Sequence, residues 1–208
     1  GTSVYLVDRV IPMLPHKLSN GICSLNPEVD RLALSCIMTI NTKGYVTNYK
    51  ISPSVIRSRK QMNYDDVNEI LENNNIPVGY EEYADTLRMM KECAELLRKN
   101  KISRGYIDFG IDELKLIVDE KGLVTDVKKR DRGIGENLIE DFMIAANEAV
   151  ATTIYFMELP FVYRIHGEPN EEKINNFLSF VSILGHSVHK MKKITPKTMQ
   201  ELLNELKD

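Results

Sequence analysis

Acidic, histidine and cysteine side chains are the residues of this sequence that could hold a metal ion, but their spacing does not favour that chemistry. Asp65 and Asp66 are adjacent, and neighbouring helical residues point in divergent directions, so we expect them to stabilise a helix N-terminus instead. His186 and His189 have no acidic or cysteine partner nearby, which argues against a zinc site. The cysteines share no metal-ligand spacing and are expected to be buried, reduced thiols of a cytosolic protein: Cys23, Cys36 and Cys93.

Basic side chains gather at two places where they could contact the phosphates of a nucleic acid. One is the run over residues 128–132, and the other contains Arg57, Arg59 and Lys60. The alternative interpretation is that they are solvated charges at the ends of hairpins. The net charge of −3 and the sequence pI of about 5.9 argue against a protein coated in nucleic acid, but they allow a local basic channel.

The hydrophobic pattern predicts an α+β fold in which antiparallel hairpins pack against several helices. Alternating runs over residues 32–40 and 45–56 flank a glycine-containing turn, and a second hairpin is expected over residues 114–129. Asn63 is a suitable cap for a helix over Tyr64–Glu72. A longer helix is indicated by one apolar stripe: Tyr83, Leu87, Met90, Ala94 and Leu97.

The remaining segments are predicted from shorter signals. Residues 5–30 are expected to form loops and short turns, because prolines and Gly21 interrupt them. A short strand is expected over residues 161–165 and an amphipathic helix over residues 170–184. A last helix is expected to begin at Thr195, with Pro196 in its first position.

A helix over residues 136–157 is predicted to be covered on two sides. Its stripes are Leu138, Phe142, Ala146, Ala149 and Thr153 on one side, and Glu140, Ile144, Asn147 and Ala151 on the other. The second stripe is partly apolar, so we expect Glu140 and Asn147 to lie in or near buried surroundings. Because buried polar groups need partners, the pattern predicts a hydrogen-bond network or a ligand-facing cleft.

The chain as a whole is typical of a soluble globular protein. No apolar run reaches the roughly 18 residues that a membrane span needs, and no secretion signal is evident, so we expect a cytoplasmic protein without a membrane partner. The chain opens without an initiating methionine and closes at Asp208 inside a helical pattern. We therefore expect a piece of a longer protein.

Several sequence blocks, taken together, are far more specific than any single motif. They are GTSVY at 1–5, VIPMLP at 10–15, LSNGICSLNP at 18–27, DRL at 30–32, IEDFMIAAN at 139–147 and FVYRIHGEP at 161–169. In this order they resemble the catalytic domain of the ribonuclease II/ribonuclease R family, and the ribonuclease R branch most. The resemblance spans nearly the whole chain.

The resemblance implies that the parent protein hydrolyses single-stranded RNA processively from its 3′ end. Such enzymes hold Mg²⁺ in a cluster of aspartates, because the metal activates a water and neutralises the charge that grows on the phosphate. The aspartate pattern is absent from this sequence and in the family lies upstream; an arginine block lies downstream. We therefore expect residues 1–208 to be part of a single catalytic domain that, by itself, binds no metal and is inactive.

The resemblance also assigns RNA contacts, each of which has a purely structural alternative. It implies that Tyr5 grips the 3′-terminal nucleotides, that Tyr64 contacts a sugar, and that Phe109 stacks on a base. One member of the pair Glu140 and Asp141 is implied to hydrogen-bond the terminal ribose. The two-stripe argument favours Glu140 as the buried member, whereas the family register leaves Asp141 open.

Two other functions are consistent with the residues. The chain could belong to a non-catalytic RNA-binding or scaffolding module that shares this segment, which the sequence on either side would distinguish. A weaker alternative is a metal-dependent hydrolase centred on Glu140, Asp141 and His166. For His166 and Asn147, a structural role is expected instead.

Overall fold

A computed structural model describes residues 3–7, 9–107, 113–120, 122–130, 132–165, 167–186 and 194–206 of the chain. Within these residues it contains α-helices together with small antiparallel two-stranded sheets, which confirms the expected α+β class. Phe109, the candidate for base stacking, lies outside the described residues, as does His166.

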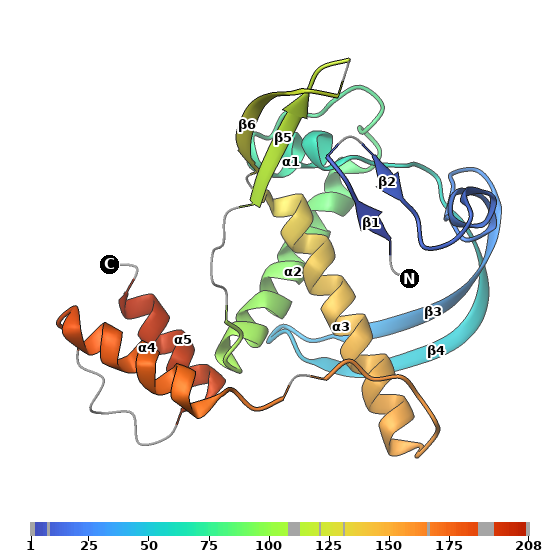
Figure 1. The fold of residues 1–208 in the computed structure, drawn as a ribbon. Helices are drawn as coiled ribbons and strands as arrows, with labels where there is room; N and C mark the ends of the chain where they lie inside the picture. Colours follow the sequence, from blue (N-terminus) through green and yellow to red (C-terminus); the bar gives the residue numbers. More distant parts are fainter. Residues whose placement is uncertain are drawn as a thin grey trace.

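Three hairpins make up the described sheets (Figure 1). The longest pairs β3 (Asp30–Ile40) with β4 (Val46–Arg57), and another pairs β5 (Glu113–Val118) with β6 (Val124–Arg130). Both were predicted from alternation. The third pairs β1 (Val4–Tyr5) with β2 (Val10–Ile11), and a π-helix, η1 (Lys17–Ile22), follows it. The prediction of loops alone over residues 5–30 was therefore wrong, because two-residue strands are too short to show a periodicity.

Helices α1 (Tyr64–Glu72), α4 (Glu171–Ile183) and α5 (Pro196–Glu205) begin where the sequence places capping side chains. In α1 the Asn63 side chain accepts a hydrogen bond from the Asp66 backbone N–H at 2.8 Å, as predicted. In α5 the Thr195 hydroxyl accepts one from the Thr198 N–H at 3.2 Å. The others are α2 (Ala84–Ser103) and α3 (Ile134–Phe156).

The core forms where α1, α2 and α3 meet. Its buried side chains include Ile70 of α1, Leu87 of α2 and Leu138 of α3, which are 2%, 6% and 3% exposed. Burying a large aliphatic side chain of this kind stabilises the fold by roughly 1.5–3 kcal/mol. This three-helix contact fixes how α3 lies against α2, and so it fixes which residues of α3 face inward.

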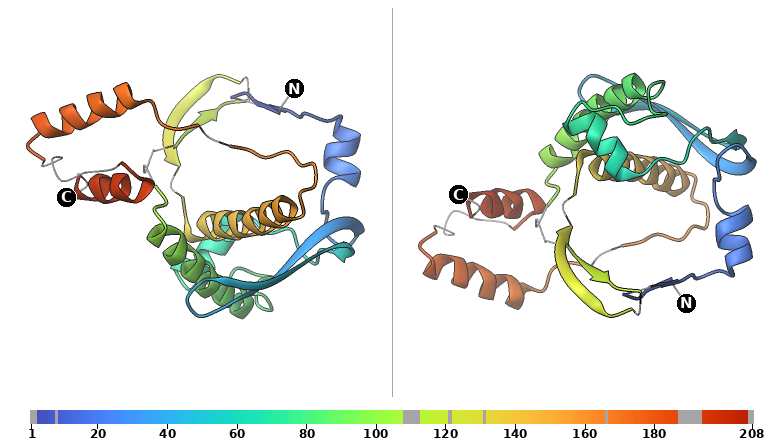
Figure 2. Two further views of the ribbon diagram at one scale, coloured as in Figure 1. Left: turned by 90° about the horizontal axis from the view of Figure 1, so that it is seen from below. Right: turned by 90° about the horizontal axis from the view of Figure 1, so that it is seen from above.

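Viewed from below and above, the ribbon follows an open ring (Figure 2). Helices α1 to α3 and the β3–β4 hairpin form one side, and β1–β2 and β5–β6 form the other, with η1 between them. Helices α4 and α5 lie outside this ring. The ring therefore places β1 across from α3.

Two further expectations were wrong. Residues 161–165 do not form a strand, and Val162 and Ile165 are 92% and 83% exposed. None of the described strands pairs with this segment, and an extended stretch needs a partner for its backbone groups to become a strand. The thiols are free, but Cys23 is exposed and Cys36 and Cys93 are half-buried rather than buried.

A search of the described helices finds none whose length and apolar character would suit a bilayer crossing.

The tip of the β3–β4 hairpin generates a testable prediction about stability. Gly44 has φ +76°, and a Cβ at this position would collide with the Leu96 carbonyl oxygen of α2. Gly122, in the β5–β6 turn, has a similar φ of +79°, but a Cβ there would meet open space. Replacing Gly122 with Ala should therefore cost only the backbone strain, about 1–3 kcal/mol at most, whereas Gly44→Ala adds the collision.

Urea unfolding of the two variants measures this difference. We expect Gly44→Ala to lower the free energy of unfolding clearly more than Gly122→Ala does. Equal losses would show that the hairpin tip does not rest against α2.

Candidate functional site

The acidic pair of α3 lies against cationic side chains of α2. Asp141 is 3% exposed, and its Oδ2 accepts a hydrogen bond from Arg98 Nε at 2.8 Å. Its Oδ1 lies 2.7 Å from Lys101 Nζ, an ion pair without hydrogen-bond alignment. Lys101 is itself 7% exposed. Both oxygens of Asp141 are thus engaged by buried or half-buried cations, as a buried carboxylate requires.

Glu140 is the more accessible member of the pair. Its side chain is 29% exposed. Oε1 accepts from Lys101 Nζ at 3.2 Å and from the Tyr106 hydroxyl at 3.1 Å. Oε2 accepts from Arg132 at 3.4 Å, the longest of these contacts. Lys101 also lies 3.8 Å from the centroid of the Tyr106 ring, so this one ammonium group joins both carboxylates and the aromatic ring.

The expectation that Glu140 is the buried member of the pair is wrong. The buried stripe of α3 contains Leu138 and Ala149 of the first predicted stripe, together with Asp141 and Ala145. Asn147, which was expected to be structural in buried surroundings, is exposed. The apolar content of a stripe did not decide its burial, because the packing of α2 and of the β3–β4 hairpin turns the adjacent stripe inward.

Three side chains of this site were not predicted from the sequence: Arg98, Lys101 and Tyr106. A signal was available for two of them. Arg98 and Lys101 are spaced three apart, beside the apolar stripe of α2 that ends at Leu97. Cations at that spacing lie on one face of a helix. Placing them opposite Asp141, however, requires the α2–α3 packing.

Tyr64 lies beside the same part of α3. It is the first residue of α1, 40% exposed, and with Gly135, Leu138 and Ile139 it lines a cavity of about 380 Å³. The Asn68 side chain fixes this arrangement, since its Oδ1 accepts from the Gly135 N–H at 2.7 Å. Tyr64 is therefore held near the turn of α3 that precedes Glu140.

Tyr5 is not brought to the acidic pair. Its strand, β1, lies across the ring from α3 (Figure 2). Tyr5 is itself 79% exposed. The structure thus brings Glu140 and Asp141 together, places Tyr64 beside the same helix, and leaves Tyr5 on a separate hairpin.

Several of the basic candidates contact other parts of this chain. Arg57 lies 3.8 Å from Glu28 and Lys60 donates to the Gly79 carbonyl at 2.8 Å. Lys128 lies 3.9 Å from Asp126 on its own strand. Arg132 differs, because its guanidinium reaches Glu140. The interpretation as solvated charges at hairpin ends therefore suits Arg57 and Lys128, which are 60% and 67% exposed, whereas Arg132 connects to the acidic pair.

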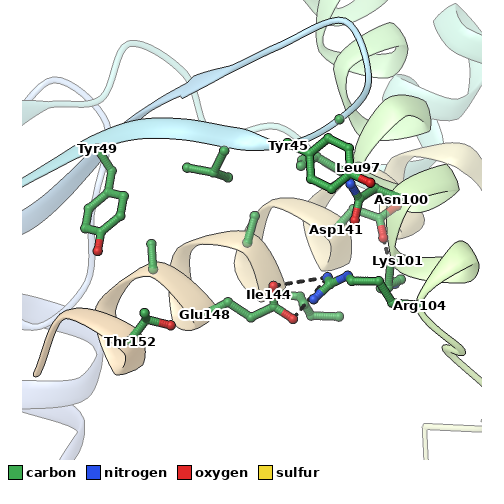
Figure 3. Close-up of a pocket in the computed structure, with 14 residues that line it drawn as sticks. Tyr45, Tyr49, Leu97, Asn100, Lys101, Arg104, Asp141, Ile144, Glu148 and Thr152 are labelled. Atoms are coloured by element: carbon green, nitrogen blue, oxygen red, sulfur yellow. Dashed lines mark hydrogen bonds and ion pairs between the residues drawn. The ribbon is translucent and has the colours of Figure 1, made fainter. Parts of the chain in front are cut away.

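A second cavity, of about 250 Å³, lies on the other side of Asp141 (Figure 3). It lies between the β3–β4 hairpin and the buried stripe of α3, and Asp141 and Lys101 line its wall. Two anions and two cations line it, Asp141 and Glu148 with Lys101 and Arg104, so its charges balance. Among the described residues, no group of three or more His, Cys, Asp or Glu side chains is arranged to hold a metal ion.

Comparison of the sequence with known families finds a match to the RNB domain over residues 1–208. Among curated relatives, the chain is 44% identical to Ribonuclease R 1 of Lactococcus lactis and 47% identical to Ribonuclease R of Thermotoga maritima. Both alignments cover 100% of this chain, but only 26% and 29% of the relatives. The chain thus spans less than a third of the length of these proteins.

Solved structures with the same fold include Mycoplasma genitalium RNase R in complex with ribose-methylated single-stranded RNA. The TM-score is 0.92 at 30% identity, covering 100% of this chain and 33% of the other. Yeast Ssd1, described as a pseudonuclease, matches with a TM-score of 0.66 at 17% identity over 97% of this chain and 26% of the other. That second likeness shows the fold alone.

The burial of Asp141 predicts a large loss of stability when its charge is removed. Asp141→Asn leaves Lys101 and Arg98 in buried or half-buried positions without their carboxylate, which should cost about 3–5 kcal/mol. The matched control is Glu148→Gln, which breaks the exposed α2–α3 ion pair with Arg104 (3.1 Å, both side chains 54% exposed). Exposed pairs contribute about 0–1 kcal/mol.

Chemical denaturation of both variants and the unchanged chain supplies the comparison. A loss for Asp141→Asn as small as that for Glu148→Gln would mean that the buried ion pair does not hold α2 to α3.

Proposed function

Because the chain belongs to the RNB domain family, we propose that it is the RNA-holding part of a processive, hydrolytic 3′→5′ exoribonuclease. The observation that carries the proposal is the family match over the whole chain, at 44–47% identity to proteins named ribonuclease R. The activity is proposed for the longer parent protein, because the chain spans 26–29% of those relatives. The proposed partner is the 3′ end of a single-stranded RNA.

Accessibility supports Glu140, rather than Asp141, as the proposed ligand of the terminal ribose. The Asp141 side chain is 2% exposed and both of its oxygens have cationic partners, so it has no free edge for a ligand. The Glu140 side chain is 29% exposed, and among the described residues its Oε2 contacts Arg132, at 3.4 Å. A carboxylate there can accept a hydrogen bond from a ribose hydroxyl, the group that separates RNA from DNA.

Tyr64 and Tyr5 are proposed to contact neighbouring parts of the RNA. Tyr64 is partly exposed beside the α3 turn that precedes Glu140, which suits a hydroxyl that contacts a sugar. Tyr5 is 79% exposed on β1, so its ring face is available for stacking, which contributes about 1–3 kcal/mol per base. The base-stacking role of Phe109 remains a prediction from the family resemblance.

The described residues do not fit a metal site. The cations Lys101, Arg98 and Arg132 already neutralise the Glu140–Asp141 pair. A divalent cation at this pair would have to displace them, which disfavours a hydrolase centred on Glu140 and Asp141. We propose that Mg²⁺ in the parent enzyme is held by aspartates outside this sequence, while residues of this chain bind and orient the RNA.

The exposed apolar surface supports the proposal that the chain is one part of a single larger catalytic domain. Leu32 and Leu34 of β3 are 87% and 67% exposed, and Val162 is 92% exposed. Extended apolar surface usually marks a place that another part of the protein covers. The free cysteines are consistent with the proposed cytoplasmic location, where thiols stay reduced.

A non-catalytic RNA-binding or scaffolding module is the second candidate. It is favoured by one observation, the same fold in a protein described as a pseudonuclease. The reading frame on either side of this segment distinguishes the two, since an upstream aspartate cluster and a downstream arginine block belong only to the enzyme.

The proposed division of labour predicts that the chain alone cannot degrade RNA. Incubation of residues 1–208 with single-stranded RNA and Mg²⁺ should leave the 3′ end intact, while the parent protein should shorten it from that end. Shortening by a clean preparation of the isolated chain would contradict the proposal, and an inactive parent protein would favour the non-catalytic module.

A second prediction concerns Tyr64 in the parent enzyme. Tyr64→Phe removes one hydroxyl and keeps the ring, so it should relax discrimination against DNA more than it slows RNA degradation. The matched control is Tyr155→Phe, which changes a tyrosine that is 67% exposed near the far end of α3. The measured quantity is the ratio of RNA to DNA degradation rates. An unchanged ratio for Tyr64→Phe would exclude its role at the sugar.

A further inference from the structure

The Glu140 carboxylate accepts two hydrogen bonds at one oxygen and a longer one at the other. Lys101 and Tyr106 both donate to Oε1, at 3.2 Å and 3.1 Å. Arg132 approaches Oε2 at 3.4 Å, and its side chain is 55% exposed. The two oxygens therefore differ in their partners: Oε1 contacts the buried Lys101 and the half-buried Tyr106, whereas Oε2 contacts the exposed Arg132.

The group that fastens Oε1 is itself held rigidly. Lys101 is 7% exposed, its Nζ lies 2.7 Å from Asp141 Oδ1, and the same ammonium group lies 3.8 Å from the Tyr106 ring centroid. Asp141 is fixed in turn by Arg98 at 2.8 Å. A continuous chain of charged contacts therefore runs from the buried side of α3 to the partly exposed Glu140.

These linked contacts affect how selectively Glu140 can bind a ligand. A glutamate side chain has several rotatable bonds, and a ligand that needs one orientation must overcome the entropy of fixing them. A carboxylate whose orientation is already set by its neighbours binds more selectively, because small displacements weaken a hydrogen bond steeply.

On the basis of the proposed ribose contact of Glu140, we propose that Lys101 and Tyr106 are positioning residues that set the discrimination between ribose and deoxyribose at the RNA 3′ end. They hold Oε1, so that Oε2 points to the terminal ribose hydroxyl. The hydroxyl donates to Oε2 beside Arg132 or in its place. Neither Lys101 nor Tyr106 touches the RNA in this arrangement.

The test uses the full-length parent enzyme and two oligoribonucleotides that differ only in a 2′-deoxy group on the 3′-terminal sugar. The readout is the ratio of kcat/KM for the two substrates, measured on removal of the first nucleotide. A purely structural role would lower both rates together and leave this ratio unchanged.

Tyr106→Phe is the decisive variant, because it removes only the hydroxyl donor and keeps the ring beside Lys101. One hydrogen bond to a charged group contributes about 1.5–3 kcal/mol, so the ratio should fall by about tenfold or more if the orientation is lost entirely. Lys101→Met should lower the ratio further, and Lys101→Arg should restore part of it. In the double variant Tyr106→Phe/Glu140→Gln, the ratio should equal that of Glu140→Gln, since both changes act on one contact.

Arg104→Met is the matched control. It removes a cation three residues along the chain, at the residue that caps the C-terminus of α2, and this cation contacts Glu148 of α3 at 3.1 Å. The ratio should stay at the wild-type value in this variant, because that bridge does not reach Glu140.

The outcomes separate this inference from the proposed function on which it depends. If Glu140→Gln leaves the ratio unchanged, the ribose role of Glu140 itself is wrong. If Glu140→Gln lowers the ratio but Tyr106→Phe does not, positioning is refuted. That second comparison still decides the matter if Lys101→Met fails to fold.

Discussion

The buried ion pair between Lys101 of α2 and Asp141 of α3 is the interaction on which the rest of the site depends. Its two groups are 7% and 3% exposed and lie 2.7 Å apart, with Arg98 completing the partners of the carboxylate. Unpaired, either charge would be costly at this depth. The pair therefore constrains the rotation of α3 against α2, within a core that α1 completes.

This rotation gives two adjacent acidic residues different roles. Successive residues of an α-helix are turned by about 100° from one another, so when Asp141 faces α2, Glu140 lies at the edge of the helix contact. Asp141 is buried between its cationic partners, and the Glu140 side chain stays 29% exposed. Neighbours with the same charge thus separate into a residue that holds the fold and one that is available to a ligand, and Lys101 contacts both.

The sequence predicted the elements better than their packing. Local signals were sufficient for the Asn63 cap of α1, the Thr195 cap of α5 and the two longer hairpins. The first predicted stripe of α3 was right for Leu138 and Ala149, but the burial of Asp141 and Ala145 was missed, because adjacent stripes have similar composition and only the position of α2 decides between them. Lys101 and Tyr106 were not predicted for the same reason, since it takes the helix packing to bring them to Glu140. Both contact this residue of α3 from more than 30 residues away along the chain. The acidic pair itself was found through a family block rather than through its spacing.

The central claim is that Glu140 faces the RNA while Asp141 stays paired with Lys101. A structure of the parent protein bound to single-stranded RNA that it cannot hydrolyse measures this directly. We expect Glu140 Oε2 within hydrogen-bond range of the terminal ribose 2′-hydroxyl, roughly 2.5–3.0 Å between oxygens, and the Asp141–Lys101 pair unchanged. A ribose bound to Asp141, or an RNA end remote from α3, would contradict the claim.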